Sequence, residues 1–112
     1  MSKSVEVTLE AISHYQVFFM GYNTQSHDAK IALYNKLKRV GSLYFYRDGK
    51  DIPADEMTLN GAALHFNMDK FRNAHHLLQS EKPMYLRWDP NDGVGYIQTS
   101  VEPTGEEEGK YK

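Results

Sequence analysis

The stretch covering residues 64–88 changes its hydrophobic period twice, and this change constrains the fold more than any other part of the sequence. Up to Met68, apolar side chains occupy every second position, which is the period of a half-buried β-strand. Over residues 69–80 they recur at spacings of three and four, which predicts a helix with one apolar face. Pro83 ends this helix because proline lacks a backbone N–H, and residues 84–88 then alternate as a strand again.

The predicted helix is too short to be stable by itself in water, so its apolar face must pack against a sheet. That face is formed by Phe71, Ala74, Leu77 and Leu78. Further strands are expected at residues 5–10, 15–20, 42–47 and 95–101. We therefore expect a single α+β domain over residues 1–101, with one main helix at about residues 69–80 before the last two strands. Its sheet should be mostly antiparallel with six or seven strands, or curled into a half-open barrel.

Two segments leave their place in this sheet open. Residues 15–20 are apolar on both faces, so we expect them to be central in the sheet or covered by the helix. Residues 29–40 fit either a helix ending at Gly41 or a strand hairpin. We favour the hairpin, because the aromatic strand at residues 42–47 needs a neighbour and a hairpin provides one nearby.

Composition restricts the class of protein. The 112 residues include 40% hydrophobic residues and eight tyrosines, which is typical of a folded chain. Cysteine is absent, so disulfide and thiolate chemistry are excluded. The longest clearly apolar run, residues 17–20, is far too short to cross a bilayer, so we expect a soluble, cytoplasmic protein that does not bind membranes. From Glu102 onward the chain is acidic and lacks apolar periodicity, which predicts a disordered tail over residues 102–112.

No motif in the sequence points to catalysis, a metal or a cofactor. The adjacent His75 and His76 would point in different directions from a helix, so they are a poor metal pair. The turn-like stretch at residues 89–93 lacks the ligand spacing of a calcium loop. Ser13 and His14 are neighbours, but no acid stands in a recognisable third position. We therefore expect a non-enzymatic protein without a cofactor.

Charge and aromatic residues suggest a binding surface. Residues 29–47 contain five basic residues and no acidic one, although the net charge of the whole chain is -2. If the strands at residues 42–47, 64–68 and 84–88 are neighbours, their outward side chains form one patch. The residues expected in this patch are Tyr44, Tyr46, His65, Tyr85 and Arg87. A basic hairpin formed by Lys36, Lys38 and Arg39 is expected beside it.

This patch supports two functional hypotheses. Tyrosine-rich sheet faces and sheet edges are common protein interfaces, so we expect a small interaction module that binds a protein partner or a second copy of itself. The alternative is a single-stranded DNA- or RNA-binding protein, in which Tyr44, Tyr46 and Tyr85 stack on bases while the basic hairpin contacts phosphates. The low net charge counts against strong phosphate binding.

Overall fold

The computed structural model describes residues 6–21 and 27–100 and confirms the α+β class. The single α-helix of this part, α1 (Phe71–Ser80), follows a short 3₁₀ turn at Met68–Lys70 and precedes the last two strands, as predicted. Asn67 begins the turn because its side-chain oxygen accepts a hydrogen bond from the N–H of Asp69. The helix therefore starts close to the residue at which the hydrophobic period changes.

Five strands form the larger sheet, in the order β2-β3-β4-β6-β5. One pair of neighbours, β4 and β6, runs parallel, and the other three neighbouring pairs are antiparallel. The strands are β2 (His14–Phe19), β3 (Ala29–Asn35), β4 (Lys38–Tyr46), β6 (Gly61–Asn67) and β5 (Glu56–Thr58).

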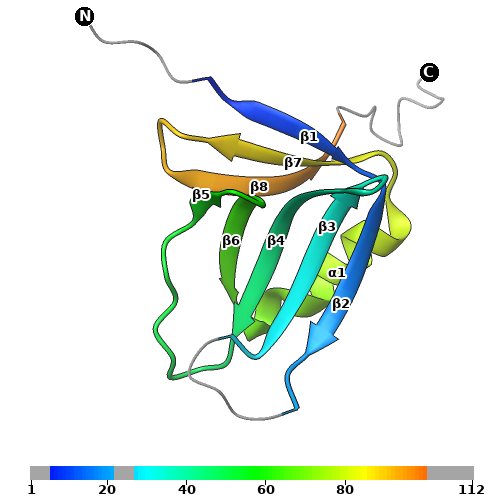
Figure 1. Ribbon diagram of the computed structural model, residues 1–112. Helices are drawn as coiled ribbons and strands as arrows, with labels where there is room; N and C mark the ends of the chain where they lie inside the picture. Colours follow the sequence, from blue (N-terminus) through cyan, green and yellow to red (C-terminus); the bar gives the residue numbers. More distant parts are fainter. Residues whose placement is uncertain (1–5, 22–26, 101–112) are drawn as a thin grey trace, which may run out of the picture.

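The smaller sheet contains three antiparallel strands in the order β1-β7-β8. They are β1 (Thr8–Ile12), β7 (Met84–Asp89) and β8 (Val94–Thr99). Figure 1 shows this sheet lying across one end of the larger sheet, and the two sheets do not close into a barrel. Only Ser13 separates β1 from β2, so one extended stretch of chain contributes a strand to each sheet.

The described residues thus hold eight strands in two sheets, where six or seven strands in one sheet were expected. Two features account for the difference. The bend at Ser13 splits one extended stretch, and side-chain alternation does not reveal which partner each half pairs with. The extra strand β5 has three exposed residues, so it lacks the apolar pattern by which strands are recognised.

Residues 29–40 form the strand hairpin that the sequence analysis favoured over a helix. β3 and β4 are joined by a tight turn at Lys36 and Leu37, where Lys36 has a φ of 60°. Ala29, Ile31 and Leu33 are fully buried on one face of β3, which a hairpin against the core explains.

The core lies between the larger sheet and α1. In Figure 1, α1 lies behind β2, β3 and β4. The predicted apolar helix face is confirmed: Ala74 and Leu78 are buried, while Phe71 and Leu77 pack against the core. Phe71 contacts the buried ring of Phe45 edge-on, with 5.0 Å between centroids. Within the described residues, no helix combines the length and apolar character needed to cross a membrane.

The two sheets pack through close contacts at glycine and through one carboxylate. A Cβ atom at Gly95 would lie 2.5 Å from the Leu64 side chain, so β8 approaches β6 where no side chain intervenes. The Asp55 carboxylate accepts a hydrogen bond from the N–H of His65 at 2.9 Å and another from the N–H of Gly95 at 3.0 Å. Asp55 therefore links a strand of one sheet to a strand of the other.

Candidate functional site

The side of the larger sheet opposite α1 is not covered by a helix, and we call it the open face. Four residues cross it in one row, because the registers align Phe18 of β2, Lys30 of β3, Tyr44 of β4 and His65 of β6. The Lys30 Nζ lies 5.2 Å from the centre of the Phe18 ring and 5.9 Å from that of Tyr44. Tyr44 in turn stacks on His65 at 5.2 Å. The row is a chain of cation–π and stacking contacts.

Tyr46 does not stand open to solvent as predicted. Only 6% of it is exposed, and its hydroxyl lies 2.8 Å from Nδ1 of His65. Its ring also rests against His65, at 5.7 Å between centroids. Strand alternation assigns a side chain to a face but does not tell whether neighbours on that face cover it, which is why the sequence analysis missed this burial.

His65 is the most constrained polar group of the open face. Its Nε2 is buried and has no hydrogen-bond partner among the described residues. Burial lowers the pKa of His65 below its ordinary value of 6.5, an effect that the nearby Asp55 and Glu56 carboxylates partly oppose. The same kind of burial raises the pKa of the Tyr46 hydroxyl. Burial therefore favours the neutral form of both side chains.

The predicted single patch is divided between the two sheets. Tyr85 and Arg87 belong to β7, which lies between β1 and β8 and is not a neighbour of β4 or β6. Arg87 lies over the ring of Tyr96 on β8, with its guanidinium carbon 5.3 Å from the ring centre. The structure thus brings Tyr44, Tyr46 and His65 together but places Tyr85 and Arg87 on another surface. The expected adjacency was wrong because it assumed one continuous sheet.

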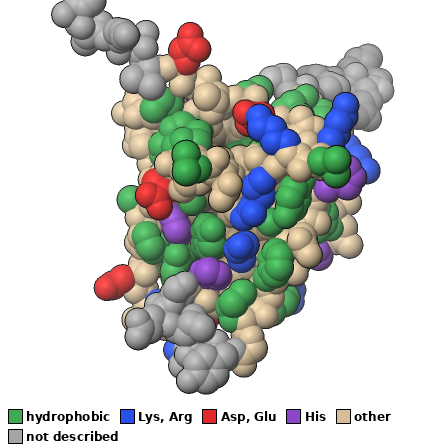
Figure 2. Space-filling model, viewed as in Figure 1, with side chains coloured by type: hydrophobic (Ala, Val, Ile, Leu, Met, Phe, Trp, Pro, Cys, Tyr) green, Lys and Arg blue, Asp and Glu red, His purple; other side chains and the backbone are tan. Residues whose placement is uncertain are grey.

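The basic hairpin does form, at the turn between β3 and β4. Lys36 and Lys38 are exposed there, whereas Arg39 is half-buried. The Arg39 guanidinium donates to the Ser42 hydroxyl at 2.6 Å and lies 5.8 Å from the ring of Tyr34. Figure 2 shows Lys and Arg side chains along the middle of the open face, bordered by hydrophobic and His side chains. The hairpin therefore offers two free lysine side chains and one arginine that is already engaged.

One acidic residue neutralises the opposite end of this basic region. The Asp28 carboxylate accepts hydrogen bonds from the Arg47 backbone N–H at 2.9 Å, the Arg47 guanidinium at 3.0 Å and the Lys50 ammonium at 3.1 Å. The hydrogen bond from the Arg47 N–H is the main cause that lowers the pKa of Asp28. Asp28 precedes the run of basic residues in the sequence, and only the fold reveals that it pairs with Arg47.

The strand β2 forms a free edge of the larger sheet. It was expected to be central or covered by the helix, but it pairs only with β3 and so ends the sheet within the described residues. The helix covers one of its faces, since Phe19 contacts Phe71 at 4.9 Å and Tyr15 contacts His75 at 5.6 Å. Phe19 is nevertheless 63% exposed. The strand's apolar character on both faces predicted either a central position or cover by the helix; the first is wrong, and the second is confirmed on one face.

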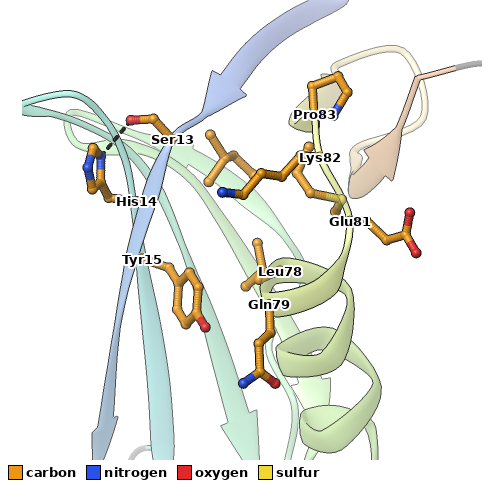
Figure 3. A pocket seen from close by; sticks show the side chains of 10 residues that line it. Ser13, His14, Tyr15, Leu78, Gln79, Glu81, Lys82 and Pro83 are labelled. Carbon is orange, nitrogen blue, oxygen red and sulfur yellow. Dashed lines mark hydrogen bonds between the residues drawn. The ribbon is translucent and has the colours of Figure 1, made fainter.

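A cleft of about 740 Å³ opens where α1 ends, between the turn at residues 81–83 and the bend at Ser13. Figure 3 shows Ser13 and His14 on one wall and Leu78 and Lys82 on the other. The Ser13 hydroxyl lies 2.7 Å from Nδ1 of His14 and accepts a hydrogen bond from the backbone N–H of Lys36 at 2.6 Å. Ser13 therefore ties the turn of the basic hairpin to the wall of the cleft.

Neither a metal-binding cluster nor similarity to a known protein assigns a role to these surfaces. Over residues 6–21 and 27–100, no three His, Asp or Glu side chains come close enough together to hold a metal ion. Comparison of the chain with protein-family models, with curated proteins and with solved structures gave no match. The functional argument therefore rests on the geometry of the open face, the β2 edge and the cleft.

Proposed function

We propose that this protein is an interaction module that binds a strand of another protein chain, including a second copy of itself, along the edge of β2. One observation carries the proposal: β2 is a six-residue outer strand whose sequence, HYQVFF, contains no Asp, Glu, Lys, Arg or Pro. Exposed edges of this length are usually protected by charges, proline or bulges, because an unprotected edge recruits other strands. An edge without such protection is suited to strand addition.

The backbone of β2 supports this mode of binding. The N–H of Met20 donates to the carbonyl of Asp28, just beyond the last pair of the β2–β3 register. Hydrogen-bonded pairs alternate in an antiparallel ladder, so the same register directs the N–H and C=O groups of Tyr15, Val17 and Phe19 outward. An incoming strand can pair with these three residues.

The side chains of β2 are also suited to a second copy. An antiparallel pair of β2 strands centred on Val17 would place Phe19 of one chain opposite Tyr15 of the other. Cross-strand aromatic pairs of this kind contribute about 0.2–1 kcal/mol each. The same register places Phe18 opposite Gln16 on the open face, so no charged side chains are opposed.

The test is self-association of the full chain, measured by sedimentation over a concentration series. Phe19→Lys should abolish association, because it places a charge in the apolar edge opposite Tyr15 of the other copy. Leu59→Lys is the matched control, because Leu59 is fully exposed in the turn between β5 and β6, at the other side of the sheet. It should associate like the wild-type chain.

A labelled synthetic peptide with the sequence of β2 extends the test to other strands. It should bind the wild-type chain and protect the amides of Tyr15, Val17 and Phe19 from hydrogen exchange. A chain that neither associates nor binds this peptide would contradict the proposal.

The open face favours a second candidate function, single-stranded nucleic-acid binding. The observation behind it is the alternation of cations and rings, in which Lys30 lies between Phe18 and Tyr44 and Arg39 lies over Tyr34. Among the three tyrosines expected to stack on bases, only Tyr44 is partly exposed on this face, and one side of its ring is already stacked on His65.

Fluorescence anisotropy with single-stranded DNA and RNA at low and physiological salt tests this candidate. Binding should weaken steeply with salt, and Lys30→Glu combined with Lys38→Glu should abolish it. Lys70→Glu is the control, because Lys70 is an exposed residue of the 3₁₀ turn that precedes α1. An affinity that does not change in the double variant would exclude the open face.

A further inference from the structure

The described part of the chain ends beside the cleft. β8 finishes at Thr99, whose partner in the register is Met84 of β7. Met84 lines the cleft, together with Pro83 and Lys82 from the preceding turn. Residues 101–112 therefore follow directly from a position at the cleft rim.

The cleft combines an apolar floor with positive charge. Ile12, Leu78 and Met84 contribute the apolar side chains. Figure 3 shows the Lys82 side chain reaching into the space between β2 and α1, whereas the Glu81 carboxylate points away from it. Such a site favours a ligand that carries carboxylates on a partly apolar backbone.

The positive charge continues beyond the cleft onto the basic hairpin. The Ser13 hydroxyl, on the cleft wall, accepts the hydrogen bond from the backbone N–H of Lys36. Lys36 and Lys38 are exposed on this turn, and no described carboxylate forms an ion pair with either of them. Lys82 in the cleft and the exposed lysines of the hairpin, whose turn is bonded to Ser13, thus place positive charge at this end of the molecule.

We propose that the cleft and the neighbouring hairpin lysines are a binding site for an acidic peptide segment, and that the chain's own residues 102–112 occupy it. This segment contains four glutamates, three of them consecutive at residues 106–108, and two lysines. An extended chain advances about 3.3 Å per residue, so the seven residues from 102 to 108 can reach roughly 23 Å. The negative charge of the segment matches the Lys82 ammonium and the hairpin lysines.

Attachment to β8 makes the contact effective even if each ion pair is weak. A short tether holds the segment at a millimolar effective concentration, so a contact too weak to detect between separate molecules is occupied within one chain. Because the pairs lie at the surface, salt should release the segment. The consequence is a basic end that is masked until a competing polyanion or acidic protein displaces the segment.

The experiment is paramagnetic relaxation enhancement on the full chain. The chain contains no cysteine, so Gly109→Cys provides a unique attachment point for a nitroxide. We expect selective loss of amide signals at residues 12–15 and 78–84, and recovery of these signals in Lys82→Glu or at about 1 M salt. Asp92→Asn is the matched control, because Asp92 is an exposed acid in the turn between β7 and β8, and it should leave the pattern unchanged.

A mixed sample distinguishes contacts within one molecule from contacts between copies. It contains chains that carry the nitroxide but no ¹⁵N, and ¹⁵N-enriched chains that carry no nitroxide. Signal loss in the mixture would overturn occupancy by the chain's own segment. Signal loss confined to residues next to Ser100, or unaffected by Lys82→Glu and salt, would overturn the site itself. Measured below the concentration at which the chain self-associates, each of these results is independent of whether the β2 edge binds a strand.

Discussion

The two outer strands of the larger sheet differ in length, charge and cover. β5 has three residues, all exposed, and begins with Glu56. β2 has six residues, no Asp, Glu, Lys or Arg, and the helix against one of its faces. A short, charged strand gives another chain little to pair with, whereas a longer apolar strand offers a template. The difference identifies β2 as the side of the sheet where binding is expected.

The two edges of the larger sheet, at β2 and at β5, are also held in place by different interactions. Near β2, the aromatic rings of Phe19, Phe71 and Phe45 pack in series between the strand, the helix and the core. Near β5, polar and backbone constraints prevail, namely the Asp55 carboxylate and the tight turn at Gly61. Apolar packing leaves the outward backbone groups of β2 free, whereas the Asp55 carboxylate engages the N–H groups of His65 on β6 and Gly95 on β8.

The largest effect should come from breaking the apolar side. Phe71→Ala removes a ring that contacts both Phe19 and Phe45, and should lower the free energy of unfolding by about 3–5 kcal/mol. Urea denaturation measures this loss, and hydrogen exchange should show deprotection of β2 before β6. Leu37→Ala, at a fully exposed turn position, is the control and should change stability little. A loss equally small in Phe71→Ala would refute the packing described for α1.

A smaller effect should come from breaking the β5 side. Gly61 has a φ of 99°, and a Cβ atom there would collide with the Val40 carbonyl. Gly61→Ala should therefore cost about 1–3 kcal/mol. Gly49→Ala separates backbone strain from collision, because Gly49 has a φ of 92° but open space around it. Thermal or chemical unfolding should rank Gly61→Ala as the more destabilised of the two.

Acid should destabilise the larger sheet through two histidines, whose rings both lie against Tyr44. Burial lowers the pKa of His65 near β5, and burial together with Lys30 lowers that of His27 near the start of β3. In each case the unfolded chain binds a proton more readily than the folded one. The stabilisation is complete above the ordinary pKa of 6.5 and is lost as the pH falls through the lowered folded value.

Unfolding titrations between pH 7.5 and 5 measure this dependence. His65→Gln and His27→Gln should each flatten the curve, while His76→Gln, at an exposed position of α1, should not. A free energy of unfolding that increases as the pH falls would contradict the burial of both histidines.

The smallest change in stability should accompany a large change in association. Gln16 is exposed on the open face of β2, and Gln16→Lys should alter the free energy of unfolding by no more than about 0.5 kcal/mol. The added charge protects the edge, so sedimentation should show loss of self-association. Association that persists in Gln16→Lys would place the interface elsewhere than β2.

Local sequence patterns predicted the helix and the strands well, but they did not predict which strands lie next to one another. The change of period at Met68, the helix face around Leu78 and the hairpin at residues 29–40 all follow from contacts within a few residues. The predicted patch failed at Tyr85 and Arg87, because strand order depends on pairing between distant segments. The prediction that Tyr46 is open to solvent failed for a related reason, since its burial depends on His65, nineteen positions away in the sequence.

The sequence by itself determined the α+β class and the single helix before the last two strands, and it favoured a hairpin over a helix at residues 29–40. These are consequences of side-chain periodicity and turn chemistry, which act over short distances along the chain. Only the tertiary structure decided that Ser13 divides one extended stretch between two sheets and that β2 stands at an edge. Those outcomes depend on which backbone groups find partners far away in the sequence, and this pairing leaves no periodic mark on the strand itself.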